Sequence, residues 1–290
     1  MKMNKIVLGT VQFGLPYGIN NTIGQIQKEE VFEILNLAQK KGIVYIDTAA
    51  AYGNAEEILG EYFNSNQKHS FRVITKFSFK DNNTCEQSLL ESLFKLRQES
   101  VDTIMFHSFA DYQAHLDELP SFIKNFKGSK FFNIGVSVYT NQEAEATIDN
   151  KDINIVQLPF NLLDNNIKRN EIFIKLKSAG KTIHTRSVFL QGLFLKNLNL
   201  FPESLKDLKT SIQNLNKIAE SNNTQISELA LSYALANQNI DNVLIGVDSL
   251  KQFTDNISYS TFSLPKNAIS DIDKINISNI DLLNPSKWKI

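Results

Sequence analysis

Cysteine is almost absent from this sequence of 290 residues, because Cys85 is the only one. One cysteine excludes a disulfide within the chain and any metal site built from several thiolates. The 4 histidines are widely spaced and show neither an HxH nor an HExxH pattern. The sequence therefore predicts that the protein has no metal site.

An excess of charge of either sign is also missing. The chain has 30 Lys and Arg against 31 Asp and Glu, and its basic residues are scattered rather than gathered into a stripe. We therefore expect neither a nucleic acid nor an anionic membrane as a partner. The sequence does not indicate an oligomeric state.

Long apolar runs and linker segments are missing as well. No stretch approaches the roughly 18 apolar residues of a membrane span, and the opening segment lacks the apolar core of a signal peptide, which predicts a cytoplasmic protein. No segment rich in proline, glycine or serine divides the chain, while hydrophobic residues make up 42% of it. Barrels of alternating strands and helices commonly use about 250 residues or more as one unit. We therefore predict a single domain that spans residues 1–290.

What the sequence does contain is an alternation of short β-branched runs and amphipathic helical patterns. The runs predict strands at residues 5–9, 43–46, 71–76, 102–107, 131–136, 154–158, 181–185 and 242–246. The helical patterns cover residues 28–41, 54–64, 84–98, 114–126, 141–149, 167–179 and 205–236, the last broken near Asn222, and one more helix starts near Ser249. Eight such units predict a (β/α)8 TIM barrel, with a doubly wound open sheet as the alternative. A short C-terminal tail, residues 275–290 with Trp288, follows the eighth unit and is expected either to cover the mouth or to pack on the barrel.

Four polar residues lie where the predicted strands end. Asp47, Lys76 and His107 come at the ends of the second, third and fourth strands, and Tyr52 lies in the loop after the second. Each alone is explained by an ordinary role: a turn cap, a surface cation, a core histidine or a packing aromatic residue. Together they indicate a site, because the carboxyl ends of barrel strands converge on one mouth.

The chemistry of this group is that of a proton donor. A tyrosine hydroxyl has an ordinary pKa of about 10 and holds its proton at neutral pH. An ammonium such as that of Lys76 favours the phenolate, and a carboxylate such as Asp47 fixes the ammonium in place. His107 could donate a hydrogen bond to a carbonyl oxygen of a substrate. The group is therefore suited to protonate an oxygen while another agent attacks the carbon.

Several segments occur in an order that resembles the aldo-keto reductase superfamily over nearly the whole chain. They are LGTVQFG, DTAAAYG at 47–53, the lysine and histidine that end the third and fourth strands, GVSVY, VQLPFNLLD, TRSVFLQGLF and IGVDSLKQFTDN. The resemblance implies an NAD(P)H-dependent carbonyl reductase without a Rossmann fold, which agrees with the lack of a GxGxxG motif after a strand. It also implies Tyr52 as the general acid, Lys76 and Asp47 as the residues that tune it, and His107 as the residue that positions the substrate.

The same resemblance implies a dinucleotide site. Its members would be Ser137 and Gln157 at the nicotinamide carboxamide, Gly9 and Thr10 under the cofactor, Ser187, Gln191, Gly192 and Leu193 in the loop across the pyrophosphate, and Gly246, Ser249, Gln252 and Asn256 near the adenosine phosphate and adenine. Gln157 also stands out without the resemblance, because a polar amide inside an apolar strand is costly to bury without a partner.

Three residues depart from the family's pattern. Arg186 stands where many relatives have an aromatic residue, and its guanidinium could either stack on the nicotinamide or pair with an anion of the substrate. Val138 replaces an asparagine that would contact the carboxamide. Asp248 stands where a basic residue often binds the 2′-phosphate of NADP. The resemblance thus favours NADP(H) as the cofactor, while Asp248 leaves NAD(H) open.

Two other functions remain open from the sequence. One is a regulatory or binding subunit that keeps the barrel and works through a partner protein. The other is an unrelated barrel lyase or isomerase in which Lys76 forms a Schiff base. For a reductase, the polar residues around the expected mouth favour a hydroxylated or anionic carbonyl compound, such as a sugar derivative, as the small-molecule substrate. Candidate walls of its pocket are the loop aromatics Phe13, Tyr17, Phe109 and Tyr112.

Overall fold

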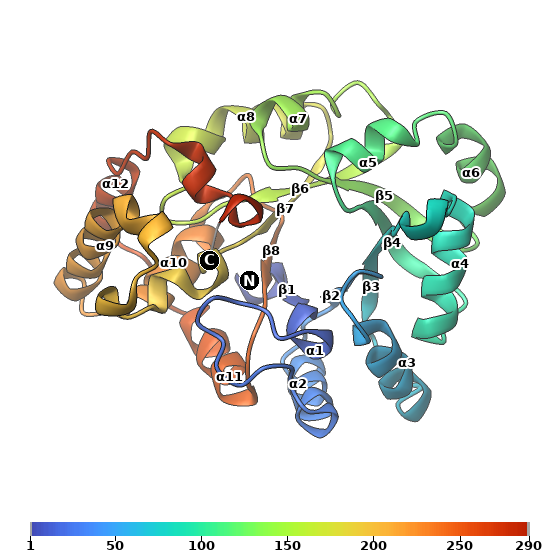
Figure 1. Ribbon diagram of the computed structural model, residues 1–290, viewed down its shortest axis with the longest axis horizontal. Coiled ribbons are helices and arrows are strands. Elements are labelled where there is room, and N and C mark those ends of the chain that lie inside the picture. Colours follow the sequence, from blue (N-terminus) through green and yellow to red (C-terminus); the bar gives the residue numbers. More distant parts are fainter. Residues whose placement is uncertain (1, 289–290) are drawn as a thin grey trace.

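Eight parallel strands close into a barrel in the computed structural model, which describes residues 2–288 (Figure 1). The strands follow one another around the barrel in chain order, and β1 pairs with β8 to close it. Their bounds are β1 Ile6–Gly9, β2 Tyr45–Asp47, β3 Arg72–Lys76, β4 Val101–Phe106, β5 Phe131–Ser137, β6 Ile153–Pro159, β7 Thr182–Arg186 and β8 Asn242–Ile245.

Helices surround the barrel as an outer ring (Figure 1). The α-helices are α1 Val11–Gly14, α2 Lys28–Lys40, α3 Ala55–Ser65, α4 Cys85–Leu96, α5 Phe109–Ala114, α6 Leu119–Phe126, α7 Asn141–Glu145, α8 Asn166–Ser178, α9 Lys209–Ser221, α10 Ile226–Ala236, α11 Leu250–Tyr259 and α12 Lys266–Asp273. The 3-10 helices are η1 Lys2–Lys5, η2 Lys80–Asn82, η3 Leu190–Leu195, η4 Leu198–Leu200, η5 Glu203–Leu208, η6 Ile280–Leu283 and η7 Pro285–Lys287.

The interior of the barrel is filled by apolar side chains. Val7, Ile74, Met105 and Ile155 form a buried cluster of their own, apart from the larger core between strands and helices. Alternate residues of a strand point to opposite faces, so β1, β3, β4 and β6 each contribute one residue to the inner cluster and others to the outer core. This two-sided burial explains why the strands are rich in isoleucine and valine.

The prediction of a (β/α)8 barrel is confirmed, and the doubly wound alternative is wrong because the sheet is closed. The predicted helix 114–126 is wrong, because a turn separates α5 from α6, which starts only at Leu119. Pro120 lies in the first turn of α6, where proline is tolerated. The predicted helix 141–149 is also too long, because α7 ends at Glu145. The expected break near Asn222 is confirmed by the end of α9 at Ser221.

The C-terminal segment packs on the barrel near the ends of β5 and β6. The indole nitrogen of Trp288 donates a hydrogen bond to the carbonyl of Leu282 at 3.0 Å. Ile280, Leu283 and Tyr139 line a cavity of about 330 Å³ beside this segment. The Trp288 side chain is thus hydrogen-bonded within the C-terminal segment.

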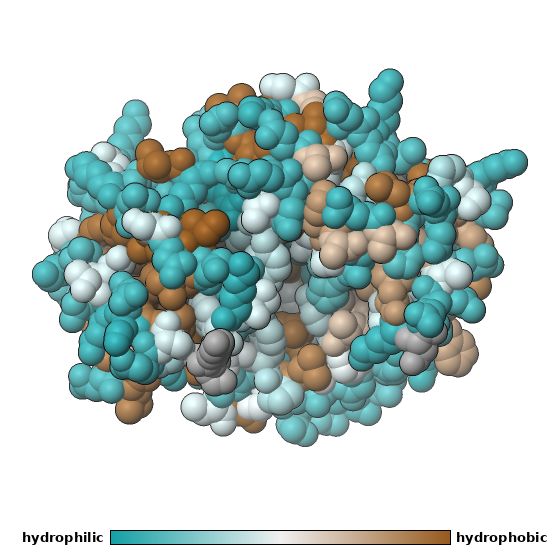
Figure 2. Space-filling view, turned by 45° about the horizontal axis from the view of Figure 1, so that its top comes forward, coloured by the Kyte–Doolittle hydropathy of each residue, from teal (hydrophilic) through white to brown (hydrophobic). Residues whose placement is uncertain are grey.

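The molecular surface is mostly hydrophilic on the face shown in Figure 2, where hydrophobic residues form separate small groups and the centre is hollowed. Among residues 2–288, no helix combines the length and the apolar character that crossing a bilayer requires.

Candidate active site

A buried ion pair joins the ends of β2 and β3. The Lys76 ammonium donates hydrogen bonds to Oδ1 of Asp47 and, at 2.9 Å, to the carbonyl of Thr48. Gln157 on β6 donates its amide Nε2 to the other carboxylate oxygen of Asp47, also at 2.9 Å. The side chains of Lys76 and Asp47 are each 1% exposed. Because both carboxylate oxygens have donors, the pair is held in one geometry.

Tyr52 is placed beside this pair by a close approach of two loops. A Cβ atom on Gly14 would collide with the carbonyl of Tyr52, and one on Gly53 would collide with the carbonyl of Gly14. Gly53 also has a φ of +57°, which favours glycine. The Lys76 nitrogen lies 5.1 Å from the centre of the Tyr52 ring, and the His107 ring meets that ring edge-on at 5.7 Å between centres.

The surroundings set the protonation states of this cluster. Burial raises the pKa of Tyr52, and the Lys76 charge opposes that rise without cancelling it. Burial alone would lower the pKa of Lys76, but Asp47 and Tyr52 outweigh it and the pKa is raised. Burial, aided by the Lys76 charge, lowers the pKa of His107 to about 4. At neutral pH the cluster therefore holds a protonated phenol, an ammonium and a neutral imidazole.

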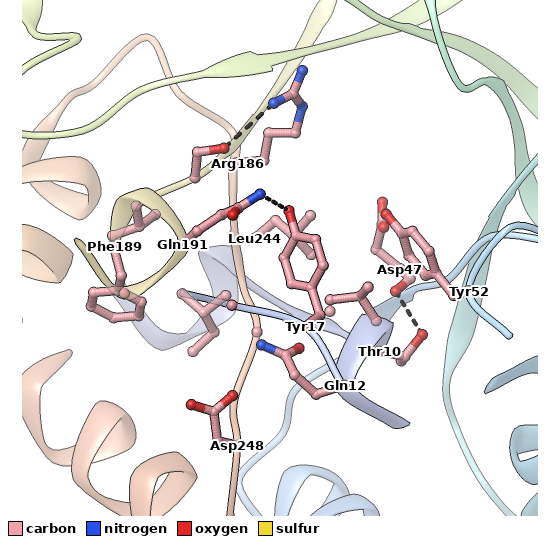
Figure 3. Close-up of a pocket in the computed structure, with 18 of the residues that line it drawn as sticks. Thr10, Gln12, Tyr17, Asp47, Tyr52, Arg186, Phe189, Gln191, Leu244 and Asp248 are labelled. Carbon is pink, nitrogen blue, oxygen red and sulfur yellow. Dashed lines mark hydrogen bonds between the residues drawn. The ribbon is translucent and has the colours of Figure 1, made fainter. Parts of the chain in front are cut away.

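These side chains open onto a cavity of about 290 Å³ at the mouth of the barrel (Figure 3). Asp47, Lys76, Tyr52 and His107 all line it, as the sequence predicts for residues at adjacent strand ends. Most of the expected dinucleotide residues line it as well: Gly9, Thr10, Ser137, Gln157, Arg186, Ser187, Gln191, Gly192, Gly246 and Gln252.

Three residues expected at the dinucleotide do not line the cavity. Leu193 is fully buried in the core. Ser249 caps the start of α11, where its hydroxyl accepts a hydrogen bond from the backbone nitrogen of Gln252 at 3.1 Å. Asn256 is buried further along α11, and its Nδ2 has no hydrogen-bond partner among the described residues.

Other lining residues were not predicted from the sequence. Gln12 on α1, Tyr139 after β5 and Leu244 on β8 line the cavity. Tyr17 lines it as expected, whereas the other aromatics proposed as walls, Phe13, Phe109 and Tyr112, do not. The alternation within β5 ends at Ser137, so it does not assign Tyr139, two residues further on, to the cavity.

Two loops meet above the cavity. We call residues 15–27 the β1 loop and residues 187–196 the β7 loop. The Gln191 amide donates to the Tyr17 hydroxyl at 2.6 Å (Figure 3). The backbone nitrogen of Ile19 donates to the Gln191 carbonyl at 3.1 Å. Ser187, Gln191 and Gly192 have positive φ values of 64°, 53° and 85°. The β7 loop therefore turns sharply against the β1 loop.

Two buried histidines give a prediction for stability. His184, whose Nε2 lies 2.9 Å from the Asn242 amide, has its pKa lowered by burial to about 4, as does His107. Between pH 6.5 and about 4 the unfolded chain binds protons on these imidazoles and the folded chain does not. We expect the free energy of unfolding to fall as pH falls through this window, in urea titrations at several pH values. A His184→Asn variant should lose part of that slope; an unchanged slope in this variant would contradict the assignment for His184.

No group of three or more His, Cys, Asp or Glu side chains within residues 2–288 is arranged to hold a metal ion. The fold and the cavity thus define a (β/α)8-barrel protein with a cluster of ionisable side chains at its mouth. The sequence profile of the Aldo/keto reductase family matches residues 5–277, and the chain belongs to this family.

Individual relatives agree with the family. L-galactose dehydrogenase of Arabidopsis thaliana is 22% identical over 284 residues, which cover 89% of this chain and 87% of that protein. The uncharacterized oxidoreductase YqkF of Bacillus subtilis (strain 168) is 23% identical over 256 residues, 80% of this chain and 82% of that protein. The crystal structure of PA4992, described as an aldo-keto reductase from Pseudomonas aeruginosa, is similar in fold, with a TM-score of 0.64 and 16% identity over 88% of this chain and 89% of that chain. The protein is therefore an oxidoreductase of a family that generally uses NAD(P)H and reduces carbonyl groups.

Proposed function

We propose that the protein reduces an aldehyde or ketone to an alcohol with a reduced nicotinamide dinucleotide, and that Tyr52 supplies the proton. The observation that carries this proposal is that Tyr52 and His107 face one cavity together with the buried ion pair of Asp47 and Lys76. A phenol beside a paired ammonium is a proton donor whose anion is stabilised where it forms.

The residues of the cavity fit a nicotinamide dinucleotide. Oε1 of Gln157 is buried and has no hydrogen-bond partner among the described residues, so it is free to accept from the carboxamide. Oε1 of Gln12, which also lines the cavity, is a further buried polar atom without such a partner. When bound, the reduced nicotinamide would supply the hydride. Ser137 and Gln157 would hold the carboxamide, and the β7 loop would cover the pyrophosphate.

The proton step follows from the protonation states. Tyr52 gives its hydroxyl proton to the carbonyl oxygen as the carbon receives the hydride, and its phenolate is stabilised by the Lys76 ammonium. Asp47 keeps that ammonium in place. Neutral His107 donates a hydrogen bond to the same oxygen and orients it.

The raised pKa of Lys76 also bears on the Schiff-base alternative. A Schiff base requires a neutral amine as the nucleophile. The Asp47 carboxylate keeps Lys76 protonated, which counts against a lyase or isomerase of that kind. A regulatory subunit would keep the dinucleotide without turnover, so measurements of turnover separate it from the proposed reductase.

The preference between the two dinucleotides depends on Asp248. The family resemblance favours NADPH, but Asp248 lines the cavity as a half-buried carboxylate. The nearby Lys251 is exposed and pairs with Asp255 at 2.6 Å. We expect Asp248→Arg to raise the affinity for NADPH relative to NADH by about tenfold or more, because about 1.4 kcal/mol of charge interaction with the 2′-phosphate gives that factor.

The control for this prediction is Asp207→Arg, which makes the same charge change at an exposed position on η5. Both variants are titrated with NADH and NADPH by calorimetry. An unchanged ratio of the two dissociation constants in Asp248→Arg would show that the 2′-phosphate binds elsewhere.

The proposed function is tested by titrating the protein with NADPH and NADH and then assaying a panel of aldehydes and ketones. Binding of a dinucleotide followed by its oxidation with one or more carbonyl compounds is the expected result. Binding without turnover, together with stable capture of a second protein, would favour the regulatory alternative. A borohydride-trapped adduct on Lys76 would favour the Schiff base.

A further inference from the structure

Arg186 is a cation in the cavity that has no carboxylate partner. It ends β7, lines the cavity and is half-buried. None of the ion pairs among residues with described side chains includes it. A guanidinium that is partly removed from water without a counter-ion is poised to bind an anion.

The charges that line the cavity do not neutralise Arg186. The lining contains two cations, Lys76 and Arg186, and two carboxylates, Asp47 and Asp248. Lys76 and Asp47 pair with each other. Asp248 and Arg186 lie on opposite sides of the hydrogen bond between Tyr17 and Gln191 (Figure 3). The positive charge of Arg186 is therefore uncompensated on its side of the cavity.

The guanidinium is positioned but not saturated. It lies over the Tyr139 ring, 4.2 Å from its centre. It donates from Nη2 to the Val138 carbonyl at 3.1 Å, and from Nε and Nη1 to the hydroxyls of Ser137 and Ser187, both at the long distance of 3.4 Å. A guanidinium has five N–H groups, so two remain for a ligand. Two of the three hydrogen bonds already made are long and therefore weak.

Arg186 also acts on the residues that would meet the substrate. Its charge lowers the pKa of Tyr52, of His107 and of Tyr17, although burial is the larger influence on each. Its hydrogen bonds run to Ser137 and Val138 at the end of β5 and to Ser187 in the β7 loop, away from Asp248. A small molecule whose carbonyl approaches Tyr52 would thus come within reach of this charge.

We propose that Arg186 binds an oxyanion of the substrate, so that the natural substrate is a carbonyl compound that also carries a carboxylate or a phosphate. This inference rests on the proposed reductase function and adds the class of substrate. The planar guanidinium, fixed on one face by Tyr139, would present its free N–H groups to two oxygens of such an anion. The anion and the carbonyl would be bound at separate points, which orients the carbonyl toward Tyr52.

The test compares pairs of aldehydes that differ in charge. 4-Carboxybenzaldehyde is paired with 4-nitrobenzaldehyde, which has the same shape without the charge, and glyceraldehyde 3-phosphate is paired with glyceraldehyde. The variants are Arg186→Gln and Arg186→Lys. The control is Arg72→Gln, which removes an exposed arginine at the start of β3, at the opposite end of the barrel.

The wild-type protein is expected to prefer the charged member of one pair or both by about tenfold or more in kcat/KM, mainly through a lower KM. Arg186→Gln should abolish this preference, measured as the ratio of kcat/KM between the charged and the neutral member of each pair. Arg186→Lys should keep part of the preference for the charged aldehyde, because the charge remains while the bidentate geometry of the guanidinium is lost. A preference in the benzaldehyde pair indicates a carboxylate on the substrate, and a preference in the glyceraldehyde pair indicates a phosphate.

Equal use of both members of each pair by the wild-type protein would overturn the inference and leave the proposed function intact. A loss of dinucleotide affinity in Arg186→Gln would also overturn it, because Arg186 would then bind the cofactor. If no aldehyde is reduced, the proposed function fails, and calorimetric titration with 4-(hydroxymethyl)benzoate decides the anion site by itself. Binding that is about tenfold weaker in Arg186→Gln than in Arg72→Gln supports the site, and equal binding rejects it.

Discussion

Tyr52→Phe is expected to lower kcat for carbonyl reduction by about 10²- to 10⁴-fold, the range that a positioned proton donor contributes. The ring remains in its place between Lys76 and His107, and only the hydroxyl is lost. The affinity for the dinucleotide should change little, because Tyr52 is proposed to act on the carbonyl oxygen. The measurement is steady-state kinetics with the best carbonyl substrate, together with calorimetric titration of the dinucleotide.

The matched control is Tyr62→Phe, which removes a phenol hydroxyl outside the cavity. Tyr62 lies on α3 and donates its hydroxyl to Oδ1 of Asn36 at 2.9 Å. This variant should lose about 1 kcal/mol of stability and keep its turnover. Equal turnover by Tyr52→Phe and the wild-type protein would show that another group supplies the proton.

Lys76→Met is expected to lower the free energy of unfolding by about 3–5 kcal/mol as well as to reduce turnover. The reason is that Asp47, 1% exposed in its side chain, would be left with only Gln157 as a hydrogen-bonding partner and no counter-ion. Urea denaturation measures the stability, and kcat with the same substrate measures the activity.

The double variant Lys76→Met/Asp47→Asn separates the two effects. Removing both charges should restore most of the stability, because a buried charge is no longer unpaired. It should not restore turnover, because the phenolate of Tyr52 would still lack its ammonium. A single Lys76→Met variant as stable and as active as the wild-type protein would contradict both roles.

The strands of the fold could be predicted closely because their signal is local. Runs of β-branched residues bounded by polar segments placed all eight within about two residues. Gly42 and Gly180, each with a φ of +76°, follow the ends of α2 and α8. The helix predicted at 114–126 failed because its apolar spacing continues through the turn at residues 115–118, between α5 and α6. Periodicity alone does not register such a break.

The acid–base residues could be predicted because strand order determines their position. Asp47 and Lys76 end adjacent strands whose register is regular, so their side chains meet at the mouth. The cavity wall was harder to predict where loops supply it. Tyr17 and Gln191 meet through a contact across 174 residues of sequence. Leu193 turns inward because the preceding residues take left-handed backbone angles, which a side-chain pattern does not reveal.

Two of the three departures from the family pattern, Arg186 and Asp248, acquire their meaning from their surroundings. The sequence identifies both as unusual residues, but it does not show whether either has a counter-ion. The structure places both on the cavity and pairs neither with an opposite charge among the described side chains. These two positions therefore carry the predictions about substrate and dinucleotide that are particular to this chain.

Transfer of deuterium from dinucleotide labelled at C4 of the nicotinamide tests the central claim most directly. The protein is incubated with the labelled reduced dinucleotide and a carbonyl substrate, and the alcohol is analysed by mass spectrometry and NMR. We expect one deuterium on the carbinol carbon from only one of the two C4 positions, and a proton from solvent on the oxygen. Dinucleotide that binds tightly but transfers no label to any carbonyl compound would contradict a reductase.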